Sequence, residues 1–385
     1  MSDDSEFDVK IKLSPTAIGR LALAFIASVT VCVVGWVITR APDETLHEHR
    51  GGWSAEAAAA AAPLVATMPP FEITDDEGRL IVQANDKANV RLWHAVLEQR
   101  GSHLPNVPQQ IGDCVSHAAK HAIEYLIYVE MKTGPPGLEF HEVFAPYIYG
   151  IARVKEGHGQ FSGSDGSCGA WAAHGASEYG VLRSDFESVP PYSGSIARAW
   201  GKTGPPEKFI AEAKKTLIKT VSPVRSADAI RDALCNGYPV TIASNVGFGP
   251  VNNFRHKVID GRIVGLEQGQ WSHAMCVIGY DGFTGSQPYF YILNSWGPTA
   301  MGTPLGDEPP GGFWVTFETM DRIARQGDSF AYSSFAGFRA RELINFFGQH
   351  QLREGEAPAE PLRRLISSHI RGSAAASPSR STLAL

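Results

Sequence analysis

The sequence predicts an α+β protein, because a helical first half of the folded part is followed by a half made of short strands. Apolar residues recur at helical spacing between Cys114 and Lys132. Later in the chain, short segments rich in β-branched and aromatic residues are separated by glycine and proline, which is typical of strands. Helices and strands that are segregated along the chain favour the α+β class.

The expected elements follow in order along the chain. Helices are predicted at 114–132, at 170–179, where Gly180 ends the helix, and at 227–235, before Asn236 and Gly237. Strands are predicted at 239–244, 273–281, 288–296 and 311–318. We therefore expect one folded unit at 85–345, with a helical part at about 105–225 and a sheet part at about 226–345.

The N-terminal region contains a predicted transmembrane helix. Leu21 to Thr39 form a run without charges, bracketed by Arg20 and Arg40, and a helix of this length spans the hydrocarbon core. The run is longer than the apolar part of a usual signal peptide, and no clear cleavage site follows it, so an uncleaved anchor is favoured. More basic residues precede the span than follow it closely. This predicts a single-pass membrane protein with the bulk of its chain on the non-cytoplasmic side.

The remaining segments are assigned by composition. Residues 1–20 are a short N-terminal tail, and residues 40–84, which include an alanine-rich run without apolar periodicity, are predicted to be a tether. Residues 346–385 are rich in Glu, Ala, Pro, Arg and Ser and are predicted to be disordered.

Composition also limits the partners. The formal net charge is −6, with no clustering of Lys and Arg, so no nucleic-acid partner is expected. The five cysteines form no CxxC pair, which argues against a structural zinc site. His117 and His121 have a spacing that can hold zinc, but Ala118 stands where a metalloprotease needs Glu. We expect neither a metal nor a cofactor.

Cys114 is the candidate nucleophile. It follows a turn at Gly112 and stands at the predicted start of a helix, where the helix dipole lowers the pKa of a thiol and favours the thiolate. A buried structural cysteine near a helix start is the alternative interpretation.

His273 and Asn294 are the candidate partners of this thiol. His273 stands near the start of a predicted strand, and Asn294 at the end of the next one. An Asn side chain can accept a hydrogen bond from one imidazole nitrogen and turn the other towards a thiol. Trp296 could shield that contact from water. Taken alone, His273 could be a core residue, Asn294 a turn residue and Trp296 core filling.

Together these segments resemble the papain-like cysteine peptidases. Cys114, His273 and Asn294 follow the order of that family's catalytic residues, HAMCVIGYD is similar to its HAV-x-x-VGY strand, and NSWG is present without change. SDGSCGAW resembles its Gly-rich substrate loop, in which Gly166, Ser167 or Gly169 would face the substrate backbone, beside Trp296. The resemblance covers about residues 105–335.

The resemblance implies a helical left domain, a β-barrel-like right domain and a cleft between them. It also implies a peptide or protein substrate, hydrolysed by a Cys114 thiolate that is paired with protonated His273. Whether such an enzyme is an endopeptidase or an exopeptidase stays open.

One departure concerns the oxyanion hole. The family's Gln lies six residues before the nucleophile, where this chain has Pro108. The expected donor is therefore Gln109, with the backbone N–H of Cys114 as the second, and Gln110 is expected to point along the loop. The loss of Gln at 108 also supports an alternative function, a catalytically weak or inactive papain-like module that binds peptides. Acyl transfer by the same residues is a third possibility.

Overall fold

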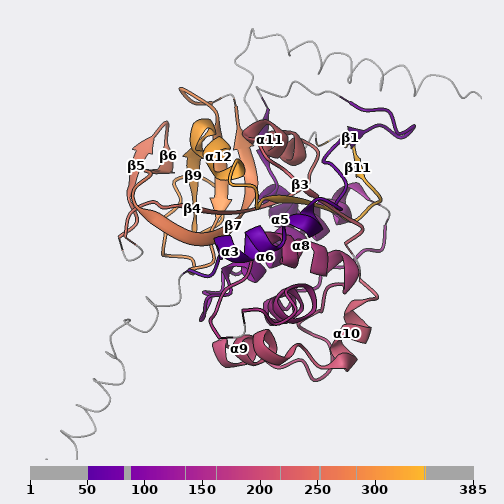
Figure 1. Cartoon of the computed structure of the whole chain (residues 1–385). Helices are drawn as coiled ribbons and strands as arrows, with labels where there is room; N and C mark the ends of the chain where they lie inside the picture. The colour runs from indigo at the N-terminus through magenta and orange to yellow at the C-terminus, as the bar shows by residue number, and fades with distance from the viewer. Residues whose placement is uncertain are drawn as a thin grey trace, which may run out of the picture.

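The computed structural model describes residues 51–81, 88–134, 136–161, 163–216, 218–250, 253–282, 284–341 and 343. These residues form a helical half and a sheet half that lie side by side (Figure 1). Helix α6 (Cys114–Thr133) lies between the halves, because it contacts both β7 (Gln270–Asp281) and the helices of the first half. The α+β expectation is thereby confirmed.

The helical half surrounds α6, which is buried along most of its length. The α6 helix begins at Cys114, as predicted, and the helix predicted at 170–179 begins one residue earlier. The other helices of this half are α5 (Trp93–Arg100), α7 (Ala145–Gly150), the π-helix η1 (Ile151–Glu156), α8 (Gly169–Glu178), α9 (Gly194–Thr203) and α10 (Glu207–Ala213).

The sheet half is built on one mixed sheet with the strand order β3-β10-β4-β7-β8-β9-β6-β5, and β2 pairs with the far end of β7. Its strands are β2 (Asn89–Arg91), β3 (Thr220–Pro223), β4 (Val240–Val246), β5 (His256–Ile259), β6 (Arg262–Gly265), β7, β8 (Tyr289–Leu293), β9 (Gly312–Thr316) and β10 (Phe330–Ser333). Helices α11 (Ala227–Cys235) and α12 (Phe317–Ala324) complete this half (Figure 1).

The expectation of a barrel is wrong in one respect. Among the described strands, β3 and β5 stand at opposite ends of the order and do not pair with each other, so the sheet is open. The four predicted strands correspond to β4, β7, β8 and β9, and the last of them ends at Thr316, whose hydroxyl caps α12. A closed barrel would need the two outermost strands to share a ladder.

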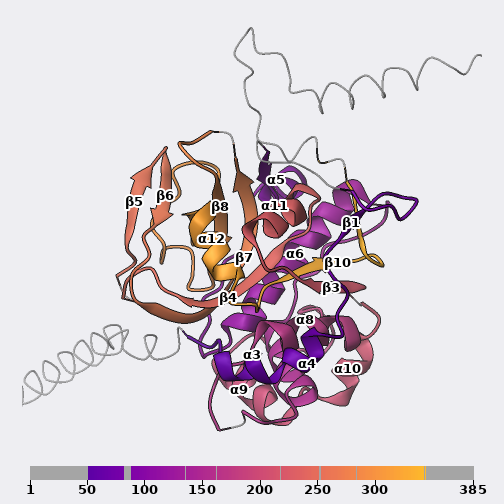
Figure 2. The same ribbon diagram turned by 45° about the horizontal axis from the view of Figure 1, so that its top comes forward.

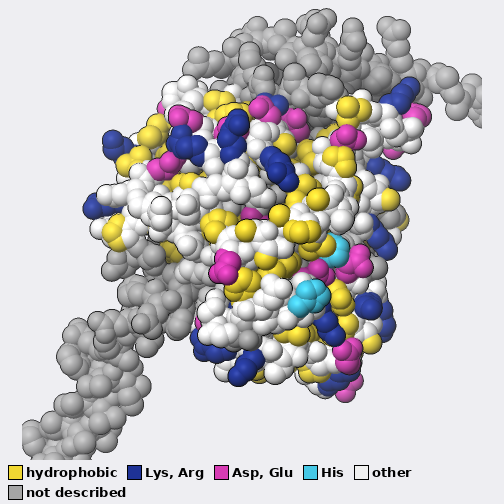
Figure 3. All heavy atoms as spheres, in the orientation of Figure 1, with side chains coloured by type: hydrophobic (Ala, Val, Ile, Leu, Met, Phe, Trp, Pro, Cys, Tyr) yellow, Lys and Arg dark blue, Asp and Glu magenta, His cyan; other side chains and the backbone are white. Residues whose placement is uncertain are grey.

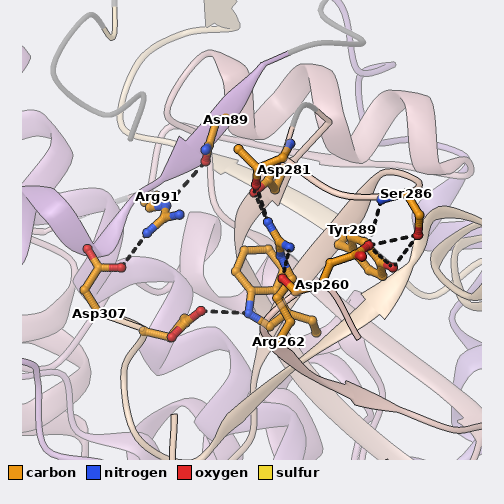
Figure 4. A network of polar contacts seen from close by, with 11 residues as sticks. Asn89, Arg91, Asp260, Arg262, Asp281, Ser286, Tyr289 and Asp307 are labelled. Atoms are coloured by element: carbon orange, nitrogen blue, oxygen red, sulfur yellow. Dashed lines mark hydrogen bonds and ion pairs between the residues drawn. The ribbon is translucent and has the colours of Figure 1, made fainter. Parts of the chain in front are cut away.

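A buried ion pair holds the sheet together at the start of β6. Arg262 donates to the carboxylate of Asp281 at the end of β7, and both side chains are buried (Figure 4). The rings of Tyr289 and Trp314 lie on the guanidinium, with centroids 5.3 and 5.2 Å from its carbon. Because a buried charge without its partner is costly, this pair fixes how β6 and β7 sit relative to each other.

Residues 51–81 correct the prediction of a tether. They contain helices α3 (Ala55–Ala60) and α4 (Ala62–Val65), and strand β1 (Ile73–Thr74) pairs in parallel with β11 (Phe338–Arg339). Figure 2 shows α3 and α4 in front of the helical half, below the sheet. The alanine-rich run lacks an obvious apolar stripe because its buried side chains are small, which hid the helices from the sequence analysis.

Several sequence-based expectations concern residues that the structure does not describe. The expected N-terminal tail, the span at 21–39 and the C-terminal tail at 346–385 lie outside the described residues. None of the helices within the described ranges is both long and apolar enough to cross a bilayer. Figure 3 shows basic and acidic side chains interspersed over one face of the molecule, with apolar atoms in its middle.

Candidate active site

Cys114 is the first residue of α6 and is fully buried. The preceding residue, Asp113, has a non-helical backbone conformation, and so the chain turns sharply into the helix at this point. The sulfur faces β7, where the backbone N–H of Ala274 forms a hydrogen bond that lowers the pKa of the thiol. Ala274 follows His273, so the candidate nucleophile and the candidate base meet at the contact between α6 and β7.

His273 is oriented by Asn294. Its Nε2 lies 2.7 Å from the Asn294 Oδ1 atom, and both side chains are buried. The other ring nitrogen, Nδ1, is buried without a hydrogen-bond partner among the described residues. Because Nε2 bonds to an oxygen that can only accept, Nε2 carries a hydrogen, and Nδ1 of a neutral ring is left free to accept a proton.

Tryptophans cover the His–Asn contact. The Trp296 ring lies 4.6 Å from the His273 ring between centroids, and the Trp271 ring lies 4.7 Å from that of Trp296. The Asn294 amide nitrogen also contacts the Met301 sulfur at 3.5 Å. These apolar neighbours exclude water from the hydrogen bond that orients the imidazole.

Burial determines the charge of both groups. It raises the pKa of the Cys114 thiol to about 12, against the Ala274 hydrogen bond that lowers it. It lowers the pKa of His273 to about 4, although the bond to Asn294 acts in the opposite direction. In this structure the pair is therefore a neutral thiol and a neutral imidazole at pH 7. The expected thiolate–imidazolium pair is not the form that this closed arrangement favours.

Gln109 is buried and bonds to Ser295, the residue that follows Asn294. Its Oε1 accepts a hydrogen bond from the Ser295 hydroxyl at 2.7 Å, and its backbone N–H donates to the Ser295 carbonyl at 2.8 Å. Its Nε2 donates to the carbonyl of Ile111 at 2.9 Å and to that of Gly51 at 3.3 Å. The shorter of these two amide bonds stays within the loop of Gln109 itself, and the longer one reaches Gly51 of another chain segment.

Gln110 is turned elsewhere. Its Oε1 accepts a hydrogen bond from the backbone N–H of Gly194 at 2.9 Å, at the start of α9. The two neighbouring glutamines therefore have different partners: the Gln109 side chain bonds to Ser295, Ile111 and Gly51, whereas Gln110 connects the loop to the helical half.

Residues Gly51–Ser54, which we term the covering segment, run between the two halves at the place where the cleft is expected. On the sheet side, the N–H groups of Gly52 and Trp53 donate to the Ser272 carbonyl at 2.9 and 3.0 Å. On the helical side, Ser167 donates to the Gly52 carbonyl at 2.8 Å, and its own carbonyl accepts from Ser54 at 2.9 Å. The segment thus pairs with the substrate loop as an extended peptide would.

Glycine at position 52 lets the covering segment pass close to the nucleophile. Gly52 has a φ of +150°, and a Cβ atom built on it would lie 2.3 Å from the carbonyl oxygen of Gly112, two residues before Cys114. No side chain can be accommodated there without moving one of the two backbones. Gly52 is therefore in direct van der Waals contact with the wall of the site.

The three candidate residues of the substrate loop have different contacts. Ser167 makes the two backbone hydrogen bonds to the covering segment, and Gly166 lies against Gly52, with a φ of +114°. The Gly169 N–H, at the start of α8, donates to the Asp328 carboxylate, which also accepts from the Trp53 indole of the covering segment. Buried Arg153 holds the loop from behind through the carbonyls of Phe161, Ser164 and Gly166.

His117 and His121 are buried in α6. Their described neighbours do not form a set of metal ligands. The Nε2 atom of His117 is 3.5 Å from the carboxylate of Asp113, and the Tyr192 hydroxyl donates to that same carboxylate at 3.1 Å. Burial lowers the pKa of His121 well below its usual value. Within the described residues, no group of three His, Cys, Asp or Glu side chains could hold a metal ion.

The sequence analysis missed the covering segment and Ser295. Ser295 carried a signal, since it lies inside the NSWG motif that was read only for Asn294 and Trp296. The covering segment carried a weaker one, a Gly-Gly-Trp sequence just before the alanine-rich run. A glycine pair next to a large aromatic can mark close backbone approach beside an anchoring side chain, but it does not say which surface is approached.

Comparisons with known proteins show what the chain is similar to. The family model of papain family cysteine proteases matches residues 159–303. Xylellain, a cysteine protease from Xylella fastidiosa, is 18% identical in sequence and has a TM-score of 0.50, over 75% of this chain and 98% of that one. Procathepsin L 3 from the larval midgut of Tenebrio molitor is 15% identical with a TM-score of 0.47, over 84% and 94% of the two chains. No curated protein matches the chain significantly.

These findings agree on the fold. Residues 159–303 match the model of papain family cysteine proteases, and the fold is papain-like. At this level of identity the solved structures support the fold alone, and the roles of individual residues rest on the geometry described above.

Proposed function

We propose that the protein is a cysteine peptidase in which Cys114 is the nucleophile, His273 the base and Asn294 the residue that orients the base. The observation that carries the proposal is the His273–Asn294 hydrogen bond of 2.7 Å, which leaves Nδ1 unpartnered beside the start of α6. A binding module has no need of an imidazole that is oriented in this way and shielded by tryptophans.

The proposed reaction is acyl transfer to the thiol followed by hydrolysis. His273 Nδ1 takes the proton of Cys114 as the sulfur attacks the peptide carbonyl carbon, and it then gives that proton to the leaving amine. The resulting thioester is cleaved by water, which His273 deprotonates in the same way. The oxygen that becomes negative is stabilised by the Gln109 amide and by the backbone N–H of Cys114.

We further propose that the structure is the latent form of this enzyme. The covering segment occupies the place of an extended substrate, and its Gly51 carbonyl accepts from the Gln109 amide. It also keeps Cys114 and His273 from water, which holds both groups neutral. Displacement of Gly51 and Gly52 would admit solvent and substrate. Solvent would reduce the desolvation penalty for ionising Cys114 and His273, and so restore the thiolate–imidazolium pair.

We also propose that the peptidase is anchored in a membrane by residues 21–39, with its folded domain on the non-cytoplasmic side. The charge-free run between Arg20 and Arg40 supports this. Extraction of membranes with alkaline carbonate tests it: the protein should stay in the membrane pellet, and a variant that lacks residues 1–40 should not. Release of the full chain by carbonate would contradict the anchor.

The activity is tested with the Gly52→Ala protein, in which a collision with Gly112 should open the site. Hydrolysis of an unstructured protein substrate such as casein should be abolished by the further change Cys114→Ala. The matched control is Cys235→Ala, which removes a buried thiol of α11 and should leave the hydrolysis rate unchanged. Equal hydrolysis by the Cys114→Ala protein, or binding of peptides without any hydrolysis, would favour the binding module instead.

A further inference from the structure

We infer that residues 53–74 are a permanent wall of the active site, and that the released enzyme therefore acts on chain ends as an exopeptidase. The part concerning the wall stands on packing alone, whereas the part concerning the substrate rests on the proposed function. The evidence is the contrast between the side-chain anchors of residues 53–74 and the bare backbone contacts of Gly51 and Gly52.

Trp53 is the first anchor. Its side chain is 8% exposed, and its indole N–H donates to the Asp328 carboxylate at 2.7 Å. The same buried carboxylate accepts from the backbone N–H groups of Gly169 at 2.6 Å and Ala170 at 2.9 Å, at the start of α8. Removal of Trp53 would leave a buried carboxylate short of a donor, which is a costly change in the interior.

The next anchors are four side chains on one face of α3, α4 and the turn that follows. Their spacing of three and four residues puts them on one side of a helical path, and all of them are buried in the main hydrophobic core of the molecule: Ala57, Ala61, Val65 and Met68. The Ser54 hydroxyl caps the start of α3 by accepting from the Ala57 N–H at 3.1 Å. This stretch is thus part of the core and not a detachable cover.

The last anchor is strand β1. Ile73 and Thr74 pair in parallel with Phe338 and Arg339, and the Ala340 N–H donates to the Thr74 carbonyl at 2.8 Å. The Ile73 side chain is buried. A cut anywhere between Trp53 and Thr74 would leave these contacts in place on both sides of the break.

Gly51 and Gly52 have no such anchors. They contribute no side chains, and their described contacts are backbone hydrogen bonds to Ser272 and Ser167 and one bond from the Gln109 amide at 3.3 Å. Backbone bonds of this kind can be replaced by bonds from a substrate or from water at little net cost. The boundary between the removable part and the permanent part therefore lies at the Gly52–Trp53 bond.

The permanent wall limits the substrate. Trp53 and Ser54 stay bonded to Ser272 and to Ser167, so the path between the two halves remains filled from Trp53 onwards. A peptide can enter only the part that Gly51 and Gly52 vacate, and it cannot continue past Trp53. The bond at Cys114 must therefore lie near one end of the substrate chain, which is the definition of an exopeptidase.

The wall is tested by limited digestion of the full chain with a nonspecific protease, followed by native chromatography and intact mass measurement. We expect a folded product that retains residues 53–74, whether or not the chain upstream of Trp53 has been removed. A folded monomer from which residues 53–74 have dissociated would overturn the inference, and this measurement does not depend on any enzymatic activity.

The substrate class is tested on the Gly52→Ala protein with one peptide in four forms: both ends blocked, either end free, and both ends free. A peptide with the appropriate free end should be cleaved at least about 10²-fold faster than the doubly blocked one, a ratio within the usual reach of one excluding pocket wall. The further change Trp53→Ala should bring cleavage of the doubly blocked peptide close to that of the free one.

The two proposals fail in different ways. If Gly52→Ala cleaves the doubly blocked peptide as fast as the free forms, the exopeptidase inference is overturned, while the proposed peptidase function stands. If iodoacetamide modifies Cys114 in Gly52→Ala but no form of the peptide is cleaved, the proposed function fails, and the exopeptidase part fails with it.

Discussion

Opening the site should greatly accelerate alkylation of Cys114. In the closed structure the pKa of this thiol is raised by burial from its ordinary 9.0 to about 12. At pH 7 an ordinary thiol has about one thiolate in 10², whereas a thiol with a pKa of about 12 has about one in 10⁵. Since the thiolate is the reacting species, removal of the burial should raise the rate by about 10³-fold, and pairing with His273 should add to this.

The variant that opens the site is Gly52→Ala, because its Cβ atom would meet the Gly112 carbonyl oxygen at 2.3 Å. The matched control is Gly78→Ala. Gly78 also has a positive φ, of +78°, but a Cβ atom there would meet no atom within 4 Å. The control therefore reproduces the backbone strain of the substitution in the same N-terminal region without the collision in the active site.

The assay is the rate of modification by iodoacetamide at pH 7, with the modified cysteine identified by peptide mass mapping. Cys168, Cys235 and Cys276, which are also buried and free, serve as internal references. We expect fast modification of Cys114 in Gly52→Ala and slow modification in the unaltered protein and in Gly78→Ala. If Cys114 of the unaltered protein reacts as fast as a free thiol, the burial argument is refuted, and with it the latent state.

The remaining predictions concern the released enzyme and the fold. Gln109→Ala should lower kcat by roughly 10²–10³-fold, the usual loss for one oxyanion donor, while Gln110→Ala should have little effect; similar losses in steady-state kinetics would contradict the separation of their roles. His273→Ala should lower the hydrolysis rate by roughly 10²–10⁴-fold, and Asn294→Ala by less, because the latter only orients the base; the reverse order in correctly folded proteins would count against these assignments. Arg262→Met should lower the free energy of unfolding by about 3–5 kcal/mol in urea titrations, because it leaves a buried carboxylate unpaired, and a loss below about 1 kcal/mol would show that water reaches that carboxylate.

Local sequence patterns predicted the helix and strands that carry the candidate site residues. The helix start at Cys114 depends on a turn and an apolar stripe within about twenty residues, and the strands that carry His273 and Asn294 are continuous segments with clear boundaries. These features could be predicted because each is decided by residues close to it in the sequence. The choice of Gln109 over Gln110 as the oxyanion donor stays a prediction.

The covering segment could not be predicted in this way. The segment forms its hydrogen bonds with Ser167 and Ser272, which are far away in the sequence. The helices that follow it, α3 and α4, bury alanines that give no strong apolar stripe. The protonation states of Cys114 and His273 could not be predicted from the sequence either. A helix start favours the thiolate, but the desolvation that opposes it arises only when the two halves and the covering segment enclose the sulfur.

The sequence by itself thus determined which residues are candidates for the chemistry, because helix starts, strand ends and short motifs are local. Only the tertiary structure decided whether those residues are open to a substrate, because burial and backbone contact bring together Trp53, Ser167, Ser272 and Asp328 from four separate parts of the chain. The same contacts hold part of an expected tether against both halves of the molecule.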